Sequence, residues 1–345
     1  MIIRNGVRDK LKEKGERMKI SSVGIAGTGF YVPEKVLTNA DLEKMVDTSD
    51  EWIIKRTGIR ERHISGPEET VSSMAEIASR KALKAAGVSP QDLDLIIMGT
   101  FTPDNPLPAA ACLLQARLGN DHAPSFDISA ACSAFLYGLE LGQKLLSSGA
   151  YQNALILVSE KLSTVVNWED RDTCVLFGDG AGAAVITHDA GRGHILDCYI
   201  GADGRKAQLM EIPAGGSALP MTHEVLDQKL QYLRMEGRET FKLAVSSMVS
   251  ASKLVLERNG YTADDITWLI PHQANLRIMK AVAKGLKLPV EKVYINVDRF
   301  GNMSGATIPI ALAEMAQKNI LKKGDLVLMV AFGGGLTWGA SLIRW

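Results

Sequence analysis

"SSMAEIASRKALKAAGVSPQDLDLIIMGTFTP" occupies residues 72–103, and its pattern returns as "FKLAVSSMVSASKLVLERNGYTADDITWLIPHQA" at residues 241–274. In each copy a helical pattern is followed by a glycine-containing stop, a short acidic turn and an apolar run of strand length. Parallel strands need helical crossovers and are mostly buried, so this unit predicts an α/β fold. Two copies of it predict two similar half-domains.

The repeat continues beyond these segments. Residues 126–159, which begin "FDISAACSAF", correspond to residues 294–332, which begin "YINVDRFGNMSGAT". In both we expect a strand, a turn rich in Gly, Ala and Ser, a second helix and a final apolar strand. The same turn holds Cys132 in the first copy and Asn302 in the second.

The repeat divides the chain into an N-terminal half at 18–190 and a C-terminal half at 191–345. Residues 1–17, "MIIRNGVRDKLKEKGER", are charged and lack the roughly 7–15-residue apolar core of a signal peptide. We expect them to form an extension outside the fold, with Met18 as the native start. An N-terminal helix is the alternative interpretation.

Composition excludes several classes of protein. The chain has 345 residues, 46% of them hydrophobic and 23% charged, with a formal net charge of zero, so it has no basic footprint for nucleic acid. No apolar run approaches the roughly 18 residues that span a membrane. The four cysteines show no C-x-x-C spacing, which argues against a metal site or a disulfide framework and favours a reducing cytoplasm. They are Cys112, Cys132, Cys174 and Cys198.

Cys132 lies where a predicted strand turns into a predicted helix. Its neighbours are small, which leaves backbone N–H groups at the helix start unobstructed, and these groups favour an anion. We therefore expect the helix start to lower the pKa of the Cys132 thiol and to make the sulfur a nucleophile. The alternative is a buried cysteine that acts as a small hydrophobic residue.

Three chemically active residues follow comparable strand positions. Cys132, His272 in "PHQAN" and Asn302 in "GNMSGAT" all stand where the repeat places the carboxyl ends of strands, which is where open α/β sheets build their sites. Taken singly, His272 could be a core histidine and Asn302 a turn residue. Together they suggest a nucleophile with two polar partners, as in covalent acyl transfer.

Six motifs in this order resemble β-ketoacyl-acyl-carrier-protein synthase III, the condensing enzyme that starts bacterial fatty-acid synthesis. They are "DEWIIKRTGIRERHI", "DISAACSAF", "FGDGAGAAV", "PHQAN", "GNMSGAT" and "FGGGLTWG". The resemblance runs from about Met18 to Trp345. It implies the thiolase fold, a duplicated five-layered α/β/α/β/α arrangement, and a homodimer. It also implies a decarboxylating Claisen condensation of an acyl-CoA primer with malonyl-acyl carrier protein.

The resemblance assigns roles to matching positions. Cys132 would carry the acyl group as a thioester, while His272 and Asn302 would donate hydrogen bonds to the malonyl thioester oxygen and stabilise the enolate. The backbone N–H groups of Cys132 and Gly334 would form a second oxyanion hole. Three glycines could also be only a tight turn near the C-terminus. Because the helix start is expected to activate Cys132, His272 is not expected to be an obligatory base for acylation.

The same resemblance suggests the substrate contacts. Trp52 and Arg171 match a pair that sandwiches the adenine of CoA, with Arg56 as a phosphate partner. Asn275 would bond the pantetheine amide. Surface positions Arg277 and Lys242 would meet the acidic carrier protein, although exposed cations are usually only solvated. "FGDGAGAAV" lacks the dinucleotide fingerprint and is read as packing, so no cofactor is implied and acyl-CoA is a substrate.

Alternatives remain within and outside the family. Leu107, in "DNPLPAAAC", stands where acetyl-restricted relatives often carry a bulky aromatic residue. By resemblance it reaches toward an acyl pocket, that of its own chain or of the other subunit, and its size predicts primers longer than acetyl. A related synthase of secondary metabolism is the main alternative. A weakly active scaffold that binds the carrier protein is the alternative from a different class.

Overall fold

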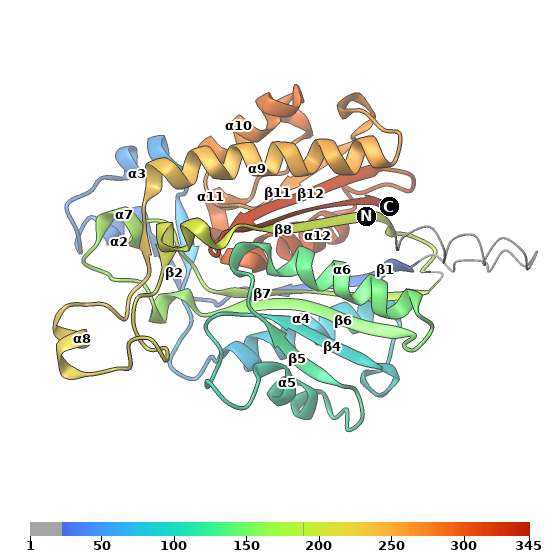
Figure 1. Cartoon of the computed structure of the whole chain (residues 1–345), viewed down its shortest axis with the longest axis horizontal. Helices are drawn as coiled ribbons and strands as arrows, with labels where there is room; N and C mark the ends of the chain where they lie inside the picture. The colour runs from blue at the N-terminus through green and yellow to red at the C-terminus, as the bar shows by residue number, and fades with distance from the viewer. Residues whose placement is uncertain (1–22, 189) are drawn as a thin grey trace, which may run out of the picture.

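The computed structural model describes residues 23–188 and 190–345, so the predicted extension at residues 1–17 and the predicted start at Met18 lie outside the described part. A nine-stranded mixed sheet runs through it in the order β11-β12-β13-β8-β1-β7-β6-β4-β5 (Figure 1). The strands are β1 (Val23–Tyr31), β4 (Leu95–Gly99), β5 (Ser125–Ile128), β6 (Asn153–Glu160), β7 (Gly180–His188), β8 (His194–Ala202), β11 (Trp268–Pro271), β12 (Leu326–Gly333) and β13 (Thr337–Arg344).

The sheet consists of two parts that meet at one narrow junction. Strands β1 and β8 are paired in register only at Gly24 and His194. On one side of this junction lie β1, β7, β6, β4 and β5, and on the other lie β8, β13, β12 and β11. Each part combines parallel and antiparallel pairs, with β4 parallel to β5 and β6, and β11 parallel to β12. The predicted division at residues 190 and 191 falls in the connection between β7 and β8.

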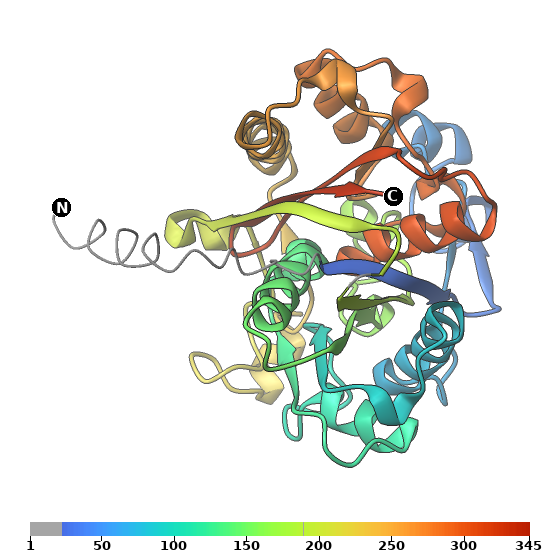
Figure 2. The ribbon, with the colours of Figure 1, turned by 90° about the vertical axis from the view of Figure 1, so that its right-hand side faces the viewer.

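Helices cover the sheet in three layers (Figure 2). Helices α4 (Val71–Ala86) and α5 (Ala110–Leu118) pack on the outer face of the first part, and α9 (Gly237–Arg258), with α10 (Leu276–Leu286) beside it, covers the second. Helices α6 (Ala134–Ser147) and α12 (Thr307–Gln317) lie between the two parts and contact strands of both. The predicted five-layered α/β/α/β/α arrangement is confirmed.

Local sequence explains why the repeated unit folds as it does. Helix α4 begins at a capping box formed by Thr70 and Ser73, and it ends at Gly87, whose φ of 69° only glycine adopts freely. Strand β4 is buried along its whole length, as expected for a strand covered on both faces. The second copy, α9 followed by β11, repeats the order of helix, glycine stop and buried strand.

One predicted strand is wrong. No counterpart to β5 forms from Tyr294 onward: an isolated bridge joins Leu269 to Val293, the residue before it, and the N–H of Tyr294 donates to the carbonyl of Leu269 at 2.9 Å. The side chain of Gln273 takes the place of a strand partner here: its Nε2 donates to the carbonyl of Tyr294 at 3.1 Å, and its Oε1 accepts from the N–H of Asn296 at 3.0 Å. The Gln273 side-chain amide thus bonds backbone groups that the predicted strand would have paired with a neighbouring strand.

The remaining elements are short, and Figure 1 shows α2, α3, α7 and α8 gathered at the end of the molecule opposite the C-terminus. None of the helices within residues 23–188 and 190–345 could cross a membrane. The short elements are β2 (Val36–Thr38), α2 (Asn39–Leu42), α3 (Asp50–Thr57), β3 (Glu61–His63), α7 (Arg171–Cys174), β9 (Met210–Glu211), α8 (His223–Asp227), β10 (Arg234–Met235) and α11 (Val297–Phe300), with 3-10 turns that include η2 (Ala131–Ser133) and η7 (Ser304–Ala306).

Candidate active site

A cavity of about 410 Å³ opens between the two halves and brings the predicted active residues together. Cys132 enters it from the N-terminal half, and His272 and Asn302 enter it from the C-terminal half. Most of the remaining wall is apolar, which is typical of a pocket for a small molecule. The apolar lining includes Phe101, Leu176, Phe177, Ile212, Leu233, Met235, Met248 and Phe332.

Cys132 sits in η2, the 3-10 turn that joins β5 to α6. The preceding residue, Ala131, has a φ of 44°, an unusual value for a residue with a side chain, and this bend turns the backbone between strand and helix. The Cys132 side chain is buried, and the hydroxyl of Ser304 donates to its sulfur at 3.5 Å. A constrained turn therefore holds the sulfur at the wall of the cavity.

The expected lowering of the Cys132 pKa is wrong. Burial raises the pKa of the thiol to about 11, although the hydrogen bond from Ser304 acts in the opposite direction. Desolvation disfavours the charged form, and helix α6 begins only at Ala134. At neutral pH the group is a thiol and needs a base before it can attack.

His272 follows the last residue of β11 and is 3% exposed. Its backbone N–H donates to the carbonyl of Val330 in β12 at 2.8 Å, so the parallel pairing of the two strands fixes its position. Burial lowers the pKa of the imidazole to about 3, so the ring is neutral at physiological pH. Its Nδ1 lies 2.7 Å from Oγ1 of Thr307, which leaves Nε2 as the ring nitrogen without a protein partner among the described residues.

The Asn302 side chain is oriented by its own loop. Its Oδ1 accepts from the backbone N–H of Ser304 at 2.9 Å, so Nδ2 remains as a donor at the cavity wall. The backbone of Asn302 is bridged to Phe177: its N–H donates to Leu176 at 2.8 Å, and its carbonyl accepts from Gly178 at 3.0 Å. The turn is therefore held by two backbone hydrogen bonds, and it directs the Asn302 amide N–H group to the cavity.

The glycine-rich segments allow close approach of backbones at the site. A Cβ on Gly333 would stand 2.6 Å from the backbone nitrogen of Cys132, so only glycine fits there. The next residue, Gly334, lines the cavity beside Cys132. In "FGDGAGAAV", a Cβ on Gly178 would meet the carbonyl of Phe300 at 2.9 Å, which agrees with the packing role expected for that motif.

Two family models match the chain: "3-Oxoacyl-[acyl-carrier-protein (ACP)] synthase III" at residues 126–204 and the C-terminal part of the same family at residues 256–345. A β-ketoacyl-[acyl-carrier-protein] synthase III of Caldanaerobacter subterraneus subsp. tengcongensis is 54% identical over 325 residues, covering 94% of this chain and 98% of the relative. The chain belongs to the β-ketoacyl-acyl-carrier-protein synthase III family.

Solved structures place the fold in the same family. The synthase III of Aquifex aeolicus superposes with a TM-score of 0.87 and 48% identity, covering 94% of this chain and 100% of that one. A priming β-ketosynthase of the R1128 polyketide pathway superposes with a TM-score of 0.86 and 32% identity, covering 94% and 96%. As a synthase III family member, the chain is an acyltransferase of the thiolase fold that carries out the condensation initiating fatty-acid synthesis.

The residues predicted to hold CoA lie close together, but their arrangement is more closed than a sandwich. The guanidinium carbon of Arg171 lies 4.9 Å from the ring centroid of Trp52, and that of Arg56 lies 5.2 Å from it. Arg171 also donates to the carbonyl of Asp47 at 2.9 Å. Because Arg171 already contacts the indole, an adenine can enter between them only if Arg171 moves.

Asn275 lies at the cavity, and the predicted carrier-protein contacts are exposed residues of α10 and α9. Asn275 lines the cavity, and its Oδ1 caps helix α10 by accepting from the N–H of Ile278 at 3.0 Å, which leaves its amide N–H group for a ligand. Two residues later, exposed Arg277 lies 5.7 Å from the ring centroid of Phe241 in α9, measured from its guanidinium carbon. Exposed Lys242 is the neighbour of Phe241 in sequence.

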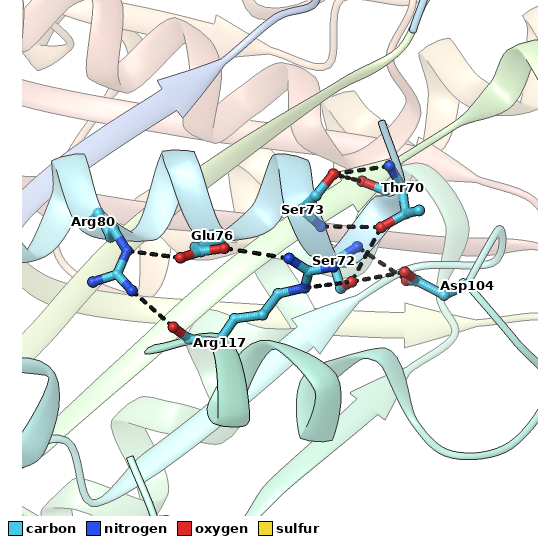
Figure 3. Close-up of polar contacts among 7 residues, drawn as sticks. All are labelled: Thr70, Ser72, Ser73, Glu76, Arg80, Asp104 and Arg117. Carbon is cyan, nitrogen blue, oxygen red and sulfur yellow. Dashed lines mark hydrogen bonds and ion pairs between the residues drawn. The ribbon is translucent and has the colours of Figure 1, made fainter. Parts of the chain in front are cut away.

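Leu107 is not part of the cavity of its own chain. It is 85% exposed on the loop between β4 and α5, so a role in that acyl pocket is not supported, while a role in the pocket of a second subunit stays a prediction. Figure 3 shows how the loop is anchored: Asp104 accepts from the Ser72 backbone N–H at 3.0 Å and from its hydroxyl at 2.7 Å. Arg117 of α5 donates to the same hydroxyl at 3.2 Å and pairs with Glu76.

A buried carboxyl group holds the start of the same loop. Glu160, the last residue of β6, accepts from the hydroxyls of Thr102 at 2.6 Å and Thr100 at 3.2 Å, and from the N–H of Phe101 at 3.3 Å. Burial raises the pKa of Glu160 to about 8. These bonds fix Phe101 in the cavity wall, and a charge on Glu160 adds to the causes that raise the pKa of Cys132.

Sequence reasoning missed Ser304 and Thr307, although both stand in the quoted "GNMSGAT" motif. Ser304 has a φ of 50° and touches two of the predicted active residues, Cys132 and Asn302. Thr307 is fully buried and touches the third, His272. Ser304 and Thr307 did not stand out in the sequence as site residues, because serine and threonine are common at helix starts.

Proposed function

We propose that the chain joins an acyl-CoA primer to malonyl-acyl carrier protein with Cys132 as nucleophile and His272 and Asn302 as its partners. One observation carries this assignment: a single cavity between the halves holds a thiol, a neutral imidazole and an amide whose Nδ2 is left as a donor. Acyl transfer through a thioester, followed by stabilisation of an enolate, needs these three groups together.

In the first half-reaction the Cys132 proton moves to Nε2 of His272 as the sulfur bonds to the acyl carbonyl carbon. The bond between that carbon and the CoA sulfur then breaks, and the CoA thiolate takes the proton from Nε2 of His272, which returns the ring to its neutral form. The backbone N–H groups of Cys132 and Gly334 are placed to stabilise the tetrahedral oxygen. No metal or resident cofactor takes part in this scheme.

In the second half-reaction malonyl-acyl carrier protein loses carbon dioxide, and the electrons of the broken bond move onto its thioester oxygen. Nε2 of His272 takes a proton from water as the negatively charged malonyl group enters, and this N–H and Nδ2 of Asn302 stabilise the enolate. Its carbon then attacks the acyl group on Cys132, and the sulfur leaves and regains its proton from His272. One proton from water is consumed over the cycle, as the overall equation requires.

Of the proposed substrate contacts, only Asn275 lines the cavity itself. Trp52, Arg56 and Arg171 offer an indole and two guanidiniums, which suit the adenine and phosphates of CoA. Asn275 suits the pantetheine arm, and exposed Arg277 and Lys242 suit an acidic carrier protein. The same site would serve a related synthase of secondary metabolism, so the primer must be measured. Free thiols at all four cysteines support a cytoplasmic location.

Intact-mass measurement after incubation with acetyl-CoA tests this function. We expect one acetyl group per chain, mapped by peptide analysis to Cys132, because a thioester survives until malonyl-acyl carrier protein arrives. Cys112→Ala is the matched control, since Cys112 is the exposed cysteine and its removal should leave the acetyl group in place. A protein that gains no acetyl mass would be the scaffold of the alternative hypothesis.

We propose a homodimer built on the β5 edge of the sheet. Strand β5 ends the sheet order, so one side of it has no strand partner among the described residues. Phe126 in this strand is 37% exposed, α5 packs against the strand, and Leu107, on the loop that leads into α5, is 85% exposed. A second copy would cover the open edge and these apolar side chains.

The size of Leu107 predicts that primers of four and five carbons are accepted alongside acetyl-CoA. A leucine is smaller than an aromatic side chain and so leaves room for longer primers. An apolar pocket discriminates between substrates that differ by one or two methylenes by only about 10–200-fold. Competition assays should show an acetyl preference below roughly a hundredfold, and Leu107→Trp should raise it. A monomer with full activity in dilute sedimentation would contradict the contribution of Leu107 to the pocket of a second subunit.

A further inference from the structure

Thr307, the first residue of α12, contacts His272 directly and connects to Asn302 and Cys132 through Ser304. Its Oγ1 lies 2.7 Å from Nδ1 of His272 and donates to the carbonyl of Ser304 at 2.9 Å. Ser304 in turn donates its N–H to Asn302 and its hydroxyl to Cys132. The turn from Asn302 to Thr307 is therefore one continuous hydrogen-bonded unit.

Counting donors and acceptors around Thr307 assigns its single hydroxyl proton. The carbonyl of Ser304 can only accept, and the backbone N–H of Gln273, 3.3 Å from Oγ1, can only donate. If the hydroxyl donates to Ser304, its oxygen can accept from both Gln273 and Nδ1–H of His272. If it donates to Nδ1 instead, the contact to Ser304 is lost and one lone pair of a buried oxygen stays empty.

The neutral ring of His272 carries one proton, on Nδ1 or on Nε2. We propose that Thr307 is a positioning residue that holds this proton on Nδ1 and so keeps Nε2 free to take the proton of Cys132. This inference rests on the proposed function, in which Nε2 is first a base and then a donor. With Nδ1–H held by Thr307 throughout, the same nitrogen performs both roles and no exchange between tautomers is needed.

A merely structural role for Thr307 predicts something different. A threonine at the start of a helix often bonds the carbonyl three residues earlier, and its loss would then change stability without changing the histidine. Thr307→Val has nearly the same shape and removes the hydroxyl. Thr307→Ser keeps the hydroxyl and is the matched control.

Nitrogen NMR of the protein labelled at histidine tests the assignment without any substrate. The chain has six histidines, and the His272 signal is identified by its loss in His272→Ala. We expect the wild type and Thr307→Ser to carry the proton on Nδ1, and Thr307→Val to shift it wholly or partly to Nε2. A wild-type spectrum with the proton on Nε2 would overturn the proposal, even if the valine variant failed to fold.

Acylation kinetics provide the functional reading. We expect Thr307→Val to lower the rate constant of acetyl transfer to Cys132 by at least about tenfold with little change in KM, because a positioned base contributes about 10²–10⁴-fold and only part of it is lost. Thr307→Ser should stay within about threefold of the wild type. If Thr307→Val acylates as fast as the wild type, Thr307 does not act on His272. If the wild type itself gains no acetyl group, the proposed function fails instead.

Discussion

Cys132→Ala is expected to abolish acyl transfer from acetyl-CoA while leaving decarboxylation of malonyl-acyl carrier protein measurable. Without sulfur no thioester can form, so transfer should fall to background. The donor of Asn302 does not depend on the sulfur, because its orientation comes from the N–H of Ser304. Labelled carbon dioxide release and acetyl incorporation, measured separately, check the two halves of this expectation.

Cys174→Ala is a suitable control for the same measurement. Cys174 is a buried free cysteine that lies outside the cavity, so its replacement should keep both half-reactions. Acetyl incorporation that persists in Cys132→Ala would mean that another residue is the nucleophile. Loss of carbon dioxide release along with acyl transfer would mean that the enolate donors cannot act without the sulfur.

The architecture could be predicted from the repeat because burial patterns are local. The helix and strand at 72–103 and at 241–274 both carry their own periodicity, glycine stop and acidic turn, and both folded as predicted. The predicted strand at Tyr294 failed for the opposite reason. The carbonyl of Tyr294 and the N–H of Asn296 are bonded by the side chain of Gln273, which is distant in sequence, and no pattern within the segment reveals that contact.

The residues of the candidate site could be predicted from the sequence, but their environment could not. Motifs and strand ends indicated Cys132, His272 and Asn302, and the structure places all three at one cavity. The pKa of Cys132 could not be predicted, because desolvation depends on everything that packs around the turn, whereas the sequence shows only the nearby helix start. The surroundings of Leu107 could not be predicted either, because its loop is anchored through Asp104 to Ser72 of α4, a residue distant in sequence.

His272→Ala and Asn302→Ala are expected to differ in acylation and to agree in decarboxylation. Each removes a donor to the enolate, which should lower carbon dioxide release by about 10²–10³-fold. Only His272→Ala also removes the base near a thiol whose pKa burial raises to about 11, so its acylation should fall by roughly 10²–10⁴-fold. Asn302→Ala should acylate near the wild-type rate, and it serves as the matched control for loss of a cavity side chain.

The pH dependence of acylation distinguishes a base from a helix start. Below the pKa of a thiol, the thiolate fraction rises about tenfold for each pH unit, so acylation of His272→Ala should rise about a hundredfold over the two units from pH 7 to pH 9. In the wild type, neutral His272 takes the proton inside the cavity, and the rise over the same range should be much shallower. If His272→Ala acylated at the wild-type rate and with the same pH profile, the helix start alone would activate Cys132, and Nε2 of His272 would be only a donor.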